Sequence, residues 1–213
     1  MPKPKGKKTR ARIIAEAASL FNQRGFEGGS LSELMEATGL EKGGIYRHFS
    51  SKETLAAEAF DYAWKVVLDT RMHDLDRIPN SVDKLKQFIA NFVNRRPSLP
   101  GGCPLLNTAI DADDGNPVLR ERARKGLHEW RDRLSSIVDT GIKRGEIGRA
   151  VDAKEVATLI ISSLEGALVI GRLERNRDAL AAARSHLERY LEAEVRRSAR
   201  KHLLCPEKYQ STS

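Results

Sequence analysis

Cysteine and long apolar runs are scarce in this chain. Two cysteines, Cys103 and Cys205, occur among 213 residues, too few for a disulfide framework. The longest apolar runs fall well short of the ~20 residues that a helix needs to span a bilayer. The basic start is not followed by the apolar stretch of a secretory signal. We therefore expect a cytoplasmic protein without a membrane segment.

Sequence signatures of enzymes and metal sites are also missing. The chain has no HExxH zinc motif, no GxSxG nucleophile elbow and no phosphate-binding P-loop. Its histidines are not paired at metal-ligand spacing on one helix face, and the acidic cluster at 111–114 lacks the ligand spacing of a calcium loop. We expect no catalysis, no metal ion and no cofactor.

Positive charge is abundant, with a net charge of +8 and 31% charged residues. Hydrophobic residues make up 40%, which is typical of a soluble globular protein rather than a disordered one. The first twelve positions hold no acid and six bases: Lys3, Lys5, Lys7, Lys8, Arg10 and Arg12. Such an arm can follow a phosphate backbone or enter a minor groove, or it can be a solubilising terminus. Arg10 and Arg12 are expected at the start of a helix.

Residues 30–53 have the pattern of a helix-turn-helix. Ser30 with Glu33 forms a capping box, which predicts a helix from about Leu31. Gly39 ends that helix, because glycine tolerates the left-handed geometry of a tight turn. A second, short helix is predicted over 42–48, and a second capping box, Ser50 with Glu53, opens the next helix. In such a unit the second helix enters the major groove of DNA.

The outer face of the second helix carries groups that suit phosphates and base edges. Basic and tyrosine side chains can bind phosphate oxygens, and Gly43-Gly44 would let the backbone approach the bases. The alternative is an ordinary turn with a solvated basic face. The candidate DNA contacts are Arg10, Ser30, Ser32, Lys42, Gly43, Gly44, Tyr46, Arg47, His48 and Lys52.

The first fifty-odd residues resemble the DNA-binding domain of the TetR family of bacterial transcription regulators. The matching stretches are TRARIIAEAASLFNQRGFEGGSLSELMEATGL and EKGGIYRHFSSKETL, about a quarter of the chain. The resemblance implies a homodimer that binds a palindromic DNA operator and usually represses. It places Lys42, Tyr46, His48 and Lys52 on DNA-contact positions. Gly44 departs from the Thr, Ser or Ala often found there, so we expect one base contact to be missing.

The rest of the chain reads as helices, and the resemblance implies that they form a larger domain for effector binding and dimerisation. We expect an all-α fold with an N-terminal three-helix helix-turn-helix domain over 1–53, a helical effector-binding and dimerisation domain over 54–203, and a loose tail over 204–213. The expected helices are 51–75, 82–93, 105–112, one from Pro117 to about Gly145, one opened by Asp152, and a last one capped by Asn176.

The last two helices are the candidates for the dimer interface. Small residues recur along the first of them, which would let helices approach closely in a four-helix bundle. The alternative is a core helix within one chain. The interface candidates are Leu159, Ser163, Gly166, Ile170, Leu180, Leu187, Tyr190 and Leu191.

A pocket for a small-molecule effector is expected among the helices from 51 to 145. Pockets are mostly apolar with a few placed polar groups, although aromatics at helical spacing are more often plain core. The candidates are Trp64, Phe88, Phe92, Asn107, Trp130, Leu134, Glu165 and Leu168. Cys103 stands before a helix and is either a low-pKa sensor or an apolar filler.

Two functions remain open at this point. The first is a dimeric transcriptional repressor that an effector releases from DNA. The second is a small-molecule or redox-sensing helical module with only nonspecific DNA affinity. Specific binding should survive excess unrelated DNA, whereas phosphate attraction alone should not.

Overall fold

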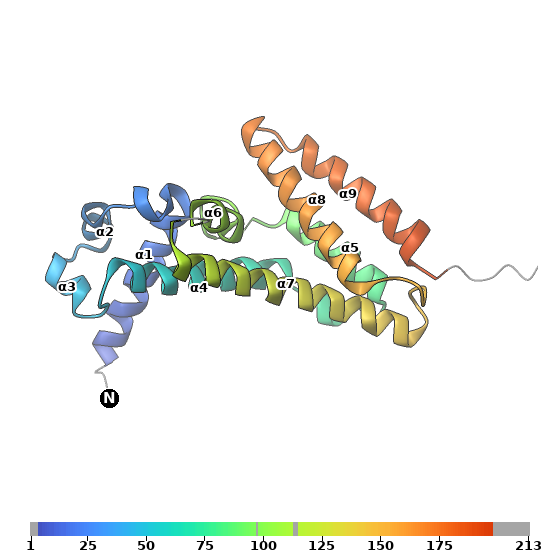
Figure 1. Ribbon diagram of the computed structural model, residues 1–213, viewed down its shortest axis with the longest axis horizontal. Coiled ribbons are helices and arrows are strands. Elements are labelled where there is room, and N and C mark those ends of the chain that lie inside the picture. The colour runs from blue at the N-terminus through green and yellow to red at the C-terminus, as the bar shows by residue number, and fades with distance from the viewer. Residues whose placement is uncertain (1–3, 97, 113–114, 198–213) are drawn as a thin grey trace, which may run out of the picture.

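The computed structural model describes residues 4–96, 98–112 and 115–197. Over these ranges all the regular elements are helices, joined by loops (Figure 1). An isolated antiparallel bridge pairs Ile147 with Arg196. The predicted all-α fold is confirmed. The elements are α1 (Pro4–Gly28), α2 (Leu31–Thr38), α3 (Lys42–Tyr46), α4 (Lys52–Arg71), the 3-10 turn η1 (Leu75–Arg77), α5 (Ser81–Asn94), α6 (Pro104–Asp111), α7 (Pro117–Arg144), α8 (Ala153–Leu173), α9 (Asp178–Tyr190) and the π-turn η2 (Leu191–Val195).

Helices α1–α3 form one end of the molecule, which we call the head, and α5–α9 form the body (Figure 1). The long helix α4 contacts α1 in the head and α7 in the body, and so connects the two parts. Helix α8 packs against both α7 and α9. The fold therefore places the helix-turn-helix at the tip, with α4 leading directly from it into the body.

Helix α4 contributes to the hydrophobic core of the head and to that of the body. Its Leu55, Ala59 and Ala63 pack with Ile13, Leu34 and Ile45 of the head, whereas Phe60, Trp64 and Leu68 pack in the body. A division of the chain after residue 53 thus cuts through side chains that are buried together. Each large apolar side chain buried in the head contributes about 1.5–3 kcal/mol, so packing of the first turns of α4 stabilises the head.

Several helix-start signals are confirmed by their caps. The Asn116 side chain accepts a hydrogen bond from the Leu119 N–H at 3.0 Å, and Asp152 accepts from the N–H groups of Lys154 and Glu155. Helix α7 ends at Arg144, and Gly145, with a left-handed φ of 72°, is its C-cap. In each of these caps the donor and the acceptor are no more than four residues apart, so a short stretch of sequence is enough to predict the helix boundary.

Other boundaries differ from the predictions. Helix α4 is capped by Ser51, whose side chain accepts from the Thr54 N–H at 3.0 Å, and not by Ser50. It ends at Arg71, before η1, rather than near residue 75. Helix α9 has Arg177 at its N-cap, although the Asn176 side chain still accepts from the Asp178 N–H.

Helix α1 begins at Pro4, so Arg10 and Arg12 lie inside it and not at its start. The basic arm is therefore largely the beginning of a helix. Lys3 and the predicted tail over 204–213 lie outside the described residues.

By length and composition, α8 is long and apolar enough to cross a membrane, with a mean hydropathy of 1.6 in its most apolar window. Continuous apolar runs in the sequence do not reveal the apolar character of α8, because isolated polar residues interrupt them. Of that window, 44% is buried inside the molecule, against α7 and α9. Core helices of water-soluble proteins have the same composition, so this feature alone is weak evidence for a membrane span.

Candidate nucleic-acid interface and body cavity

The turn of the helix-turn-helix is held by local hydrogen bonds. The Ser30 hydroxyl accepts from the Glu33 N–H at 3.1 Å, and Glu33 Oε2 accepts from the Ser30 N–H at 2.9 Å, which completes the predicted capping box. Gly39 has a φ of 62°, and the following Leu40 N–H donates to the Met35 carbonyl at 3.2 Å. These bonds fix the direction in which α3 leaves α2.

Helix α3 buries one side chain and exposes the others. Ile45 is 1% exposed and anchors the helix in the head core, whereas Lys42, Tyr46 and Arg47 are exposed. A Cβ built on Gly43 would meet nothing within 4 Å. The outer face of α3 therefore combines a bare backbone with two cations and a phenol, a composition that can approach a phosphate backbone and a groove.

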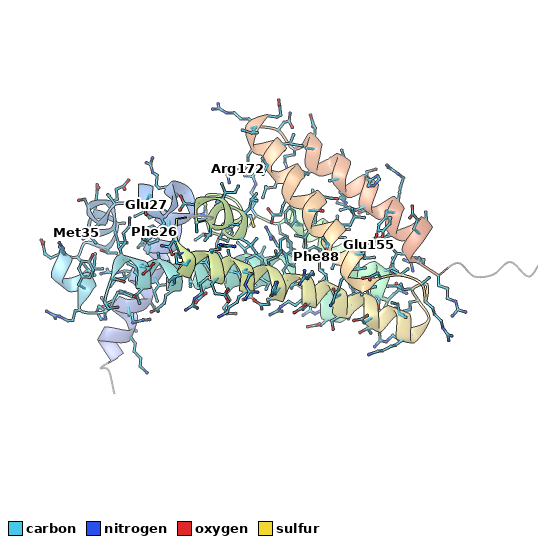
Figure 2. All side chains as sticks on the ribbon, in the orientation of Figure 1. Phe26, Glu27, Met35, Phe88, Glu155 and Arg172 are labelled. Carbon is cyan, nitrogen blue, oxygen red and sulfur yellow. The ribbon has the colours of Figure 1, made fainter. Side chains whose placement is uncertain are left out.

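Lys52 and His48 are half-buried beside this face. The Lys52 ammonium lies 4.5 Å from the centre of the Phe26 ring, so a cation-π contact positions it next to the N-terminus of α4. Figure 2 labels Phe26 and shows it where the head meets the body.

Arg10 and Ser30, two of the candidate DNA contacts, are both engaged within the protein. The Arg10 guanidinium lies 4.6 Å from the Phe49 ring centre, and its Nη2 is 2.6 Å from Glu58 Oε1. It ties α1 to α4 and would have to leave Glu58 to reach a phosphate. The Ser30 hydroxyl caps α2. Ser32 is exposed.

The head is joined to the body by a polar contact that the sequence did not reveal. Asn22 Nδ2 of α1 donates to the Pro100 carbonyl at 2.6 Å, and Asn107 Nδ2 of α6 donates to the Asn22 Oδ1 and carbonyl oxygens at 3.0 Å. Asn107, a candidate effector contact, thus bonds α6 to α1.

A second link joins α1 to α6 at a kink in α1. Gly25 has φ 78° and ψ 170°, a conformation that is essentially limited to glycine. The next residue, Phe26, donates its N–H to Asp111 Oδ2 at 2.7 Å. Helix α6 is thus bonded to α1 on both sides of the kink.

Most aromatic residues proposed as pocket walls are close-packed core. Trp64, Phe88, Trp130 and Leu134 are buried within one cluster, and Phe88 can be found by its label in Figure 2. The rings of Trp64, Phe88 and Phe92 all lie 5.6–6.2 Å from that of Trp130. Because Trp64, Phe88 and Trp130 fill the interior against one another, they leave little surface for a ligand.

Glu165 has a partner inside the protein. Its Oε1 lies 3.3 Å from Nη2 of Arg71, and both side chains are buried. The Arg71 guanidinium lies 4.3 Å from the Phe92 ring centre and 4.4 Å from that of Trp130. The sequence identified Glu165 as a buried carboxylate, but not the arginine 94 positions earlier that neutralises it.

A cavity of about 620 Å³ lies beside this ion pair, between the ends of α4, α5 and α8 and the start of α9. Of the predicted pocket residues, Phe92 and Leu168 line it. Cys103 also lines it but is 1% exposed, and burial raises its pKa to about 11. A thiol with a raised pKa is a poor nucleophile, so the geometry favours the filler role over the sensor role.

The predicted dimer residues divide into two groups. Leu180, Leu187 and Leu191 are buried in the protomer's own core, at 7%, 0% and 0% exposure, so they have almost no surface for a partner. Tyr190, Leu159 and Ser163 are half-buried, and Gly166 and Ile170 are exposed. The sequence pattern missed that Val169 and Leu173, the latter 78% exposed, extend this apolar face of α8.

Comparison with known proteins identifies the family. Residues 13–59 match the family described as bacterial regulatory proteins, tetR family, and residues 81–187 match the tetracyclin repressor-like C-terminal domain. A TetR transcriptional regulator from Chloroflexus aurantiacus is 47% identical with a TM-score of 0.88, over 92% of this chain and 100% of that one. A TetR-family regulator from Cytophaga hutchinsonii is 33% identical with a TM-score of 0.85, over 93% and 100%.

A curated relative, the HTH-type transcriptional repressor DhaR of Mycobacterium sp. strain GP1, is 25% identical over 80% of this chain and 86% of its own length. With the helix-turn-helix at the tip and both parts matched, the chain belongs to the TetR family of DNA-binding transcriptional regulators, which are not enzymes.

Proposed function

We propose that this protein is a cytoplasmic homodimeric repressor that binds a palindromic operator and is released from it by a small molecule. The observation that carries the proposal is the exposed face of α3, where Lys42, Tyr46 and Arg47 surround the bare backbone of Gly43. Repression is supported by the name of the relative DhaR, a transcriptional repressor.

The apolar face of α8 supports dimerisation. Val169, Ile170 and Leu173 are exposed on one helix, and the small residue Gly166 lies on the same surface. Pairing of this face with its symmetry mate is an isologous contact. Two heads held in this way would meet successive major grooves about 34 Å apart.

Release would act through the contacts between head and body. Helix α4 is shared by both cores, and α6 is bonded to α1 through Asn107 and Asp111. A ligand that binds better to one arrangement of these helices shifts the population towards it and changes the spacing of the heads.

The test is to select binding sites for the full-length protein from fragmented genomic DNA at about 150 mM salt, where phosphate attraction alone is weak. We expect a shared palindrome. The variant Lys42→Ala/Tyr46→Ala should lose it, whereas Lys125→Ala, an exposed lysine on α7, should keep it. Fragments without a common motif would favour a ligand-binding module with nonspecific DNA affinity.

A further inference from the structure

The body cavity is lined by a concentration of arginines. Its volume of about 620 Å³ is in the range of small-molecule sites. Phe92, Val93, Leu168 and Leu180 give it apolar walls. Five arginines also line it, and no aspartate or glutamate is among the described lining residues: Arg71, Arg95, Arg96, Arg172 and Arg177.

Part of this positive charge is not balanced within the described residues. Arg71 is neutralised by Glu165, and Arg95 lies 4.0 Å from Asp74, which also contacts His73 and Arg77. Among the described parts of the chain, Arg96, Arg172 and Arg177 form no salt bridge. A cavity with apolar walls and three such cations favours an anion and opposes a cation.

Arg172 connects the cavity to the head. Its Nη1 donates a hydrogen bond to the Gly101 carbonyl, which also accepts from Asn107 Nδ2 at 2.9 Å. The carbonyls on either side, of Pro100 and Gly102, both accept from Asn22 of α1. Figure 2 labels Arg172 near the C-terminal end of α8. One short loop thus receives bonds from the cavity and from the head.

We propose that the cavity binds an organic anion, a carboxylate or phosphate on an apolar body, and that the anion takes Arg172 away from the Gly101 carbonyl. An ionised acceptor binds a guanidinium about twice as strongly as a neutral carbonyl does, and it can do so in two places at once. Loss of the Arg172 bond leaves the Gly101 carbonyl with Asn107 as its remaining donor, which loosens the loop 100–102 that holds Asn22 and allows the head to turn. The proposal rests on the proposed function, whose effector it specifies.

Binding of the anion is tested without DNA. Isothermal titration calorimetry of the full-length protein would compare decanoate and decyl phosphate with decanol, which has the same chain length and no charge. At least one of the two anions should bind about tenfold or more tighter than decanol, because hydrogen bonds to charged groups are the stronger ones. Equal affinities for all three compounds would overturn the proposal.

The role of Arg172 is tested with a matched pair of variants. Arg172→Gln should weaken binding of the preferred anion about tenfold and leave decanol unchanged. Arg175→Gln changes an exposed arginine that does not line the cavity, and it should leave both affinities unchanged. Unaltered anion binding in Arg172→Gln, or equal losses in the two variants, would contradict the assignment.

Coupling to the head is read in two ways. The preferred anion should speed hydrogen exchange in residues 98–103 and around the α1 kink, and it should lower operator affinity. Arg172→Gln should lower operator affinity without ligand and abolish the response. If no operator exists, calorimetry and exchange still decide the anion site. If the protein binds an operator but binds neither anion better than decanol, the anion site is refuted and the proposed repressor function stands.

Discussion

The head and the cavity both present positive charge, but they assemble it differently. On the head, Lys42, Arg47 and Lys52 come from eleven consecutive residues, held by caps and a glycine turn. In the cavity, Arg71, Arg95 and Arg172 come from three elements that are distant in the sequence. The first surface is built by local rules, whereas the second exists only after the helices have packed.

The two regions also differ in the burial of one charged side chain. Lys42 and Arg47 are exposed to solvent, where a charge costs little. Four of the five arginines that line the cavity are exposed as well: Arg95, Arg96, Arg172 and Arg177. Arg71 is the buried one, beside two aromatic rings, and it needs the Glu165 carboxylate. Changes on the head should therefore alter DNA affinity, and changes at the buried pair should alter stability.

The largest expected effect is on stability, at the buried pair. Glu165→Leu leaves the Arg71 charge buried without a partner and should cost about 3–5 kcal/mol of unfolding free energy, measured by urea denaturation. Adding Arg71→Met should recover most of it, since apolar replacements of a whole pair are often neutral.

Glu155→Leu is the control, an exposed acid on the same helix that is labelled in Figure 2. It should change stability by about 0.5 kcal/mol or less. If Glu165→Leu also lowered the unfolding free energy by only about 0.5 kcal/mol, the buried ion pair would contribute no more to stability than an exposed charge.

The next effect is on assembly. In the protomer a Cβ at Gly166 would meet nothing within 4 Å, so Gly166→Leu should leave the monomer folded and disrupt the dimer. Sedimentation velocity should show a monomer, and operator affinity should fall about a hundredfold or more as the second head is lost. Ser136→Leu on the exposed face of α7 is the control. A dimer that persists in Gly166→Leu would place the interface elsewhere.

A smaller effect separates a DNA contact from an internal tie on the head. Lys42→Ala should weaken DNA binding on every sequence and reduce the slope of log affinity against log salt by about 1, as for one lost phosphate contact. Arg10→Ala should leave the slope unchanged and cost at most about 1 kcal/mol of stability, because Arg10 pairs with Glu58 in a partly exposed bridge. The reverse result would place Arg10, and not Lys42, on the DNA.

The smallest effect concerns pH. The Ser30 backbone N–H donates to Glu33 and lowers the pKa of its carboxyl group. A lowered pKa contributes stability above the unfolded value, and this is lost as the pH falls through the folded value. Glu33→Gln should therefore lower the melting temperature slightly at neutral pH, with a difference that shrinks in acid. A difference that grows as the pH falls would contradict the capping role.

The sequence predicted the features whose causes lie close together along the chain. Ser30 and Glu33 are three residues apart, and Asn116 caps the next three positions, so both signals were readable. The sequence predicted Ser50 as the cap of α4, but the adjacent Ser51 is the N-cap, and no local signal separates the two serines.

The features that sequence analysis missed depend on distant residues. The partners of Arg10 and Glu165 lie 48 and 94 positions away, and no local pattern announces them. Leu187 and Leu191 have the spacing of an interface, but the same spacing serves the core in which they are buried. Apolar periodicity gives the buried face of a helix without telling whether the neighbour is in the same chain.

The proposed repressor function requires that the α3 face recognises a base sequence and does not merely attract phosphates. The most direct measurement is the affinity of the full-length protein for a recovered operator and for the same bases in scrambled order, by fluorescence anisotropy at about 150 mM salt. We expect a ratio of about 10³ or more in favour of the operator. A ratio near one, with both affinities falling together as salt rises, would contradict it.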